Sequence, residues 1–106
     1  MTAMPVALLS WKSVTQNSLR GFAKVRIGKA LIVNDVVVHC SHGRRWASMP
    51  SKPVVDKAGV ALRDDKGKLR YVPIIEWGDR ETADSFSEGV IQAVEREHPG
   101  ATGGDG

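Results

Sequence analysis

The sequence predicts an α+β domain, in which a twisted antiparallel β-sheet of about five strands precedes one C-terminal helix. Up to residue 75, short segments alternate between apolar and polar side chains and are separated by turn-forming residues. From residue 79 to about residue 98, apolar side chains recur at the spacing of a helix. A chain of 106 residues has room for one such domain. We place it at residues 1–98 and expect a disordered tail at residues 99–106.

The first three strands are predicted by alternation and by the turns between them. Residues 6–14 alternate well enough for a first strand, and residues 16–18 are turn-forming. In the second strand, residues 19–27, one face holds Leu19, Gly21, Ala23, Val25 and Ile27, and the other holds Arg20, Phe22, Lys24 and Arg26. A tight turn at Gly28–Lys29 leads to the third strand, residues 31–39. That strand is apolar on both faces except at Asn34 and Asp35, which predicts a central position.

Two further strands flank a long, charged linker. Residues 44–49 form the predicted fourth strand, which ends at Pro50. Residues 50–68 are expected to form a mobile hairpin or flap with its tip near residues 64–67, because loops of this length are commonly functional or mobile. Residues 69–75 form the fifth strand, and Pro73 predicts that this strand lies at an edge.

Capping and terminating residues define the helix. The carboxylate of Asp79 can cap its first turn, and Pro99 with Gly100 ends it. The stripe expected to face the sheet, apolar except at its last member, is Ala83, Phe86, Val90, Ala93, Val94 and Glu97. A glycine inside a helix costs about 1 kcal/mol relative to alanine. We therefore expect Gly89 to mark close packing of the helix on the sheet.

Charge is distributed unevenly along the chain. Up to Arg63, ten Lys or Arg residues stand against two acids, and from Glu76 onward eight acids stand against two Arg residues. This division predicts one basic and one acidic surface, although solubility alone is the simpler interpretation. The chain has no apolar run of the roughly 20 residues that a membrane span needs, and its N-terminal residues lack a signal-peptide pattern. With a lone Cys40, these features predict a cytoplasmic protein without a membrane partner.

Four segments resemble the SpoVG family of small bacterial regulators, first associated with sporulation and septation. They are Ile-Val-Asn-Asp-Val-Val-Val at 32–38, Trp-Ala-Ser-Met-Pro-Ser-Lys at 46–52, Arg-Tyr-Val-Pro-Ile at 70–74 and Ala-Val-Glu-Arg-Glu-His at 93–98. Only the Met-Pro-Ser-Lys block is specific to the family. The resemblance spans roughly residues 5–98 and implies a SpoVG-like sheet with one C-terminal helix, a homodimer assembled through strand contacts, and binding of DNA or RNA in the control of gene expression. It matches Lys52 with the family's lysine after Met-Pro-Ser.

The chain departs from the family at three places. It has Pro53 where an arginine is usual, its following loop is longer, and its helix is mostly acidic. These differences favour the sheet over the helix as the binding surface. We therefore predict a nucleic-acid site made of Lys24, Arg26, Arg44, Arg45, Trp46 and Lys52. The cations would contact phosphates and Trp46 would stack on a base. The alternative is that Phe22 and Trp46 pack under the helix or in a dimer contact.

Other functional classes find less support in the sequence. His39, Cys40 and His42 lack the second ligand pair of a zinc site, and neighbouring strand residues point to opposite faces. The chain has no nucleophile elbow and no phosphate-binding glycine loop, so we expect no enzyme activity, no cofactor and no small-molecule substrate. The competing hypothesis is a protein-interaction or self-assembling scaffold module that docks an acidic partner or another copy.

Overall fold

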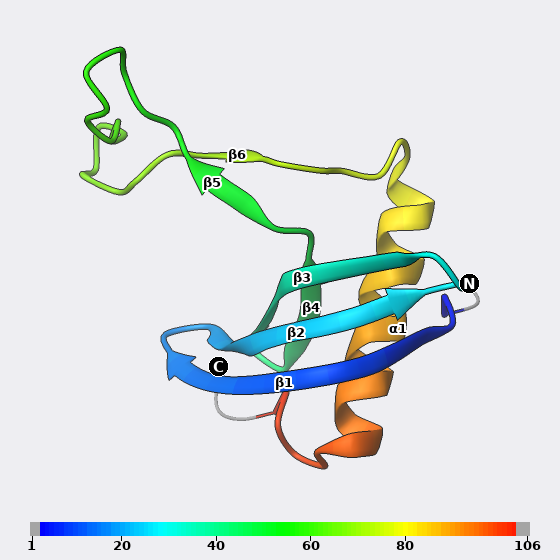
Figure 1. Cartoon of the computed structure of the whole chain (residues 1–106). Coiled ribbons are helices and arrows are strands. Elements are labelled where there is room, and N and C mark those ends of the chain that lie inside the picture. Colours follow the sequence, from blue (N-terminus) through cyan, green and yellow to red (C-terminus); the bar gives the residue numbers. More distant parts are fainter. Residues whose placement is uncertain (1–2, 104–106) are drawn as a thin grey trace.

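The computed structural model describes residues 3–103 and confirms the predicted α+β class. In chain order the elements are β1 (Val6–Gln16), β2 (Leu19–Ile27), β3 (Leu31–Ser41), β4 (Arg44–Ser48), β5 (Ser51–Pro53), β6 (Tyr71–Pro73) and α1 (Arg80–Glu97). Strands β1 to β4 form one antiparallel sheet in sequential order, and β5 pairs with β6 in a separate two-stranded sheet. Figure 1 shows α1 across one face of the large sheet and the β5–β6 segment projecting from it.

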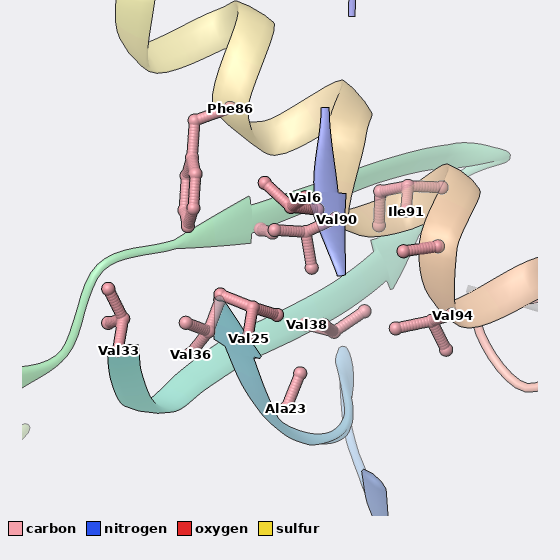
Figure 2. Packing of buried hydrophobic residues seen from close by; sticks show 12 residues of the cluster. Val6, Ala23, Val25, Val33, Val36, Val38, Phe86, Val90, Ile91 and Val94 are labelled. Atoms are coloured by element: carbon pink, nitrogen blue, oxygen red, sulfur yellow. The ribbon is translucent and has the colours of Figure 1, made fainter. Parts of the chain in front are cut away.

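The hydrophobic core lies between α1 and the sheet face that it covers, which we call the inner face. Small branched side chains of the strands meet the buried stripe of the helix (Figure 2). The buried members are Val6, Ala23, Val25, Val33, Val36, Val38, Ala47, Phe86, Val90, Ile91, Ala93 and Val94. The helix begins as predicted, because Asp79 Oδ1 accepts a hydrogen bond from the Thr82 amide at 2.7 Å. This bond lowers the pKa of Asp79. No helix within residues 3–103 is both long and apolar enough to cross a bilayer.

Two glycines permit close approaches that a side chain would block. A Cβ atom on Gly89 would stand 2.0 Å from the Met4 carbonyl oxygen, so the chain before β1 lies directly on the helix at this point. The Met4 amide donates to the Ser85 carbonyl at 2.9 Å beside it. In the sheet, a Cβ atom on Gly21 would stand 2.6 Å from the Trp11 indole, which crosses over β2. Gly89 thus marks close packing, as predicted, but its neighbour is the N-terminal segment.

Bulges interrupt the alternation of β2 and β3 at two places. Leu19 pairs with His39 whereas Gly21 pairs with Val38, so the register shifts around Arg20. As a result Arg20 is buried, with an exposed fraction of 6%, and does not join the exposed cations of β2. This corrects the predicted face of Arg20, because a bulge moves a side chain to the other side of the sheet.

The second bulge lies in β3. Between the Ala23–Val36 and Val25–Val33 pairs, Asn34 and Asp35 together oppose Lys24. Asp35 adopts a left-handed backbone with φ of 57°, a conformation that Asp and Asn tolerate better than most residues.

Residues 50–75, which we call the arm, leave the sheet after β4 and return before α1 (Figure 1). The arm contains two successive short hairpins closed by the Val55–Ala61 and Arg63–Leu69 bridges. In each hairpin the carboxylate of one aspartate accepts hydrogen bonds from two backbone amides of the turn. The aspartates are Asp56 in the first hairpin and Asp64 in the second. The sequence predicts one hairpin here, and the structure has two, besides the additional strand β5.

The chain after α1 folds back against the helix. Thr102 is buried and donates its hydroxyl to Glu95 at 2.5 Å, and the Gly100 and Thr102 amides also donate to that carboxylate. The Arg20 guanidinium donates to the Gly103 carbonyl at 3.1 Å. Residues 100–103 of the expected disordered tail are therefore held by hydrogen bonds, and residues 104–106 lie outside the described part of the chain.

Candidate nucleic-acid interface

The sheet face opposite α1, which we call the outer face, gathers cations from three strands. Cross-strand pairing aligns Lys12 with Phe22, Ser10 with Lys24 and Ala7 with Arg26. Phe22 in turn pairs with Val37, which pairs with Ser48. Core residues alternate with these positions, so the paired outer residues share one side of the sheet. Lys24 and Arg26 are exposed and Phe22 is half-buried. Lys24, a predicted phosphate ligand, is thus the next outer-face residue to the Phe22 ring along β2.

An aromatic pair extends this surface onto β4. The His39 and Trp46 rings are stacked with centroids 5.2 Å apart and planes 16° apart. The Arg44 guanidinium carbon lies 5.9 Å from the Trp46 ring, within the range of a cation–π contact. Ser18 Oγ lies 3.1 Å from His39 Nδ1. Desolvation, followed by the charge of Arg20, lowers the pKa of His39 below its usual value. The lowered pKa favours the neutral imidazole at physiological pH. His39 therefore stacks on Trp46 as an uncharged ring.

A groove of about 1040 Å³ separates the outer face from the base of the arm. Its floor includes Lys12, Phe22, Lys24, Asn34, Asp35 and His39. Tyr71 and Ile74 of the arm line the opposite side. The exposed fractions of these two residues are 58% and 62%, so apolar and aromatic surface faces solvent in the same groove as Lys12 and Lys24. A groove of this size, lined in this way, can hold extended polyanions that carry planar rings.

Arg45 lies away from the outer face. It pairs with Cys40, whose side chain is buried on the inner face, and its guanidinium nitrogen stands near Gly103. Its positive charge also contributes to the lowered pKa of Glu95, of which the Thr102 hydrogen bond is the largest cause. Consecutive strand residues point to opposite sides. Arg44 and Arg45 therefore cannot serve one surface as the sequence interpretation assumed.

Lys52 belongs to the arm. It pairs with Val72 in the β5–β6 ladder, between the Ser51–Pro73 and Pro53–Tyr71 pairs. Ser51 and Tyr71 line the groove, so alternation directs Lys52 to the other side of the arm. The structure brings Lys24, Arg26, Arg44 and Trp46 onto one face and places Lys52 and Arg45 elsewhere.

The residues considered as metal ligands are divided by the sheet. His39 stacks on Trp46 on the outer face, whereas Cys40 is buried on the inner face. Within residues 3–103, no three His, Cys, Asp or Glu side chains form a group that could hold a metal ion.

Lys24 is the one predicted site residue that lines the groove. The groove residues that were not predicted include the polar and aromatic side chains of Lys12, Asn34, Asp35 and Tyr71. Lys12 could have been found from the alternation of β1 paired in antiparallel register with β2. Tyr71 could not, because its position depends on the path of the arm. No family model, curated protein or solved structure matches this chain.

Proposed function

We propose that this chain is a non-enzymatic, cytoplasmic regulatory protein that binds DNA or RNA through its outer face. The observation that carries the proposal is that one face holds Lys12, Lys24, Arg26 and Arg44 together with the Phe22 ring and the His39–Trp46 stack. Cations supply affinity for phosphates by releasing counterions, and exposed rings supply base stacking worth about 1–3 kcal/mol each. The sequence resemblance to SpoVG supports a role in bacterial gene expression or septation.

The shape of the surface favours single strands. The one helix of the described chain buries its apolar stripe on the sheet and is acidic, so it does not resemble a helix that enters a major groove. A sheet with rings between cations resembles instead the flat platforms on which unpaired bases stack.

Arg44 and Arg45 provide a matched test, because they are consecutive arginines on opposite sides of the same strand. We expect Arg44→Ala to weaken binding of a labelled single-stranded 16-mer, measured by fluorescence anisotropy between 50 and 300 mM salt. The slope of log K against log salt should flatten by about 0.7 for each phosphate contact removed. Lys24→Ala and Arg26→Ala should act in the same direction.

Arg45→Ala is the control and should leave both affinity and slope unchanged. Equal losses in Arg44→Ala and Arg45→Ala would contradict the assignment of the site to the outer face. Absence of binding by the wild-type chain at 50 mM salt would contradict the proposed function itself.

A second candidate is a protein-interaction module, and the arm favours it. Val55 and Val60, which do not line the groove, are each more than half exposed, and no arm residue is buried. Exposed apolar side chains on a short hairpin that projects from the sheet suit pairing with another copy. We therefore propose a homodimer that assembles through the arm and displays two outer faces. Sedimentation at increasing concentration tests it: a chain that stays monomeric up to 100 µM would refute the dimer.

A further inference from the structure

The four-stranded sheet contains a single carboxylate, and that carboxylate lies in the groove. Asp35 is the only acidic residue before Asp56 in the sequence. It is exposed, lines the groove with Asn34, and stands opposite Lys24 at the β3 bulge. The only ion pair within residues 3–103 joins Arg80 to Asp84, so the Asp35 carboxylate is not neutralised by a cation within 4 Å. A negative charge in the groove weakens the attraction of the outer face for phosphates. The Asp35 carboxylate must therefore serve a purpose other than phosphate binding.

A carboxylate can only accept hydrogen bonds, and it accepts best from two adjacent donors. Among the four bases, guanine alone presents two adjacent N–H donors, N1–H and the N2 amino group, on its Watson–Crick edge. Adenine and cytosine present one amino group beside an acceptor, and thymine or uracil presents one N–H between two carbonyls. The chemistry of Asp35 therefore favours guanine.

The rings needed to hold such a base are present in the same groove. On the outer face, Phe22 is the next residue to Lys24 along β2, and Lys24 lies opposite the β3 bulge. Tyr71 reaches the same groove from the arm. A base lying on Phe22 would have its edge near the bulge and its phosphates near Lys12 and Lys24.

We propose that the groove contains a guanine subsite, in which the Asp35 carboxylate accepts the N1–H and N2–H donors of a guanine stacked on Phe22. The subsite rests on the proposed function and adds base selectivity to it. It makes guanine-containing single strands the preferred ligand class of the outer face.

The test uses labelled thymine 9-mers that carry guanine, inosine or adenine at the central position. Wild-type protein should bind the guanine oligonucleotide roughly ten- to a hundredfold more tightly than the adenine one, the range of a bidentate base contact. Inosine lacks the N2 amino group and should fall between them. The variant Asp35→Asn keeps the size of the side chain and its tolerance of a left-handed backbone, so the bulge should persist.

Asp35→Asn should abolish the preference for guanine while binding the all-thymine 9-mer more tightly, because a charge that repels phosphates is removed. Asp65→Asn is the matched control: it removes the same charge from the exposed turn of the arm, which does not line the groove, and should keep the preference. Binding without base preference, or a preference that survives Asp35→Asn, would overturn the subsite and leave the proposed function standing. If no oligonucleotide binds at 50 mM salt, both fall together.

Discussion

Gly89→Ala should destabilise the protein, although the same change stabilises most helices. In a helix interior, alanine is favoured over glycine by about 1 kcal/mol. Here the new Cβ atom would stand 2.0 Å from the Met4 carbonyl oxygen and 3.1 Å from its carbonyl carbon. Both contacts involve backbone, so relief requires the N-terminal segment to move away from α1 by about 1 Å or more.

That movement has two costs that can be worked from the structure. It strains or breaks the hydrogen bond from the Met4 amide to the Ser85 carbonyl, worth about 1 kcal/mol. It also disturbs the packing of Val6, the first core residue of β1, and overpacking of this kind costs about 1–3 kcal/mol. Set against the gain in helix propensity, the net loss in the free energy of unfolding is about 1–3 kcal/mol. For a domain of this size the melting temperature should fall by roughly 5–20 °C.

Urea unfolding followed by circular dichroism measures the difference directly. Gly78→Ala is the control, because a Cβ atom there meets nothing within 4 Å, and its free energy of unfolding should change by less than about 0.5 kcal/mol. If Gly89→Ala proves more stable than the wild type, the contact between the N-terminal segment and the helix is not as described, and helix propensity alone decides the outcome.

Two further predictions concern titration. The pKa of His39 is lowered in the folded protein, so the neutral ring stabilises the fold above about pH 6.5, and that contribution is lost as pH falls; His39→Gln should therefore reduce the drop in urea midpoint between pH 7.5 and pH 5. An unchanged drop would show that His39 does not titrate in its stack with Trp46. The pKa of Glu95 is also lowered, chiefly by the hydrogen bond from the Thr102 hydroxyl. The ionised carboxylate therefore stabilises the folded protein above about pH 4.5, and this stabilisation is lost as the pH falls. Glu95→Gln should lower the melting temperature at pH 7 and converge with wild type near pH 3, whereas a constant difference across that range would exclude the carboxylate as the cause.

The elements of this fold were largely predictable because their signals are local. Alternation in residues 19–27 predicts β2 with its observed bounds, and the Asp79 cap with the apolar stripe predicts α1 within two residues. The first arm strand, β5, was missed because its three residues, which end at Pro53, are too few to show alternation. Its pairing with β6 depends on contacts across the whole arm.

The candidate site was predicted less completely, for reasons that specific residues make plain. Lys24 and Arg26 were placed on one exposed face by alternation, and the structure keeps them there. Arg20 occupies an alternate position of the same strand, but a bulge turns its side chain to the inner face. A periodic pattern in the sequence does not indicate such a bulge. The separation of Arg45 from Arg44 could have been predicted, because consecutive residues of a strand point to opposite sides of the sheet. Asp35 was identified from the sequence only as a polar interruption of the third strand, because the groove that it lines exists only once the arm is in position.

The two ends of the arm meet at one point of the domain, so the arm is an insertion between β4 and α1. The Ile74 amide donates to the Pro50 carbonyl at 3.2 Å, so the chain leaves and re-enters the domain at nearly the same point. None of the core side chains comes from the intervening residues. Loop-closure entropy changes only slowly with length. Evolution can therefore shorten, extend or replace this insertion while the platform beneath it stays intact, and one scaffold can acquire new ligand preferences by exchanging the segment that overhangs it.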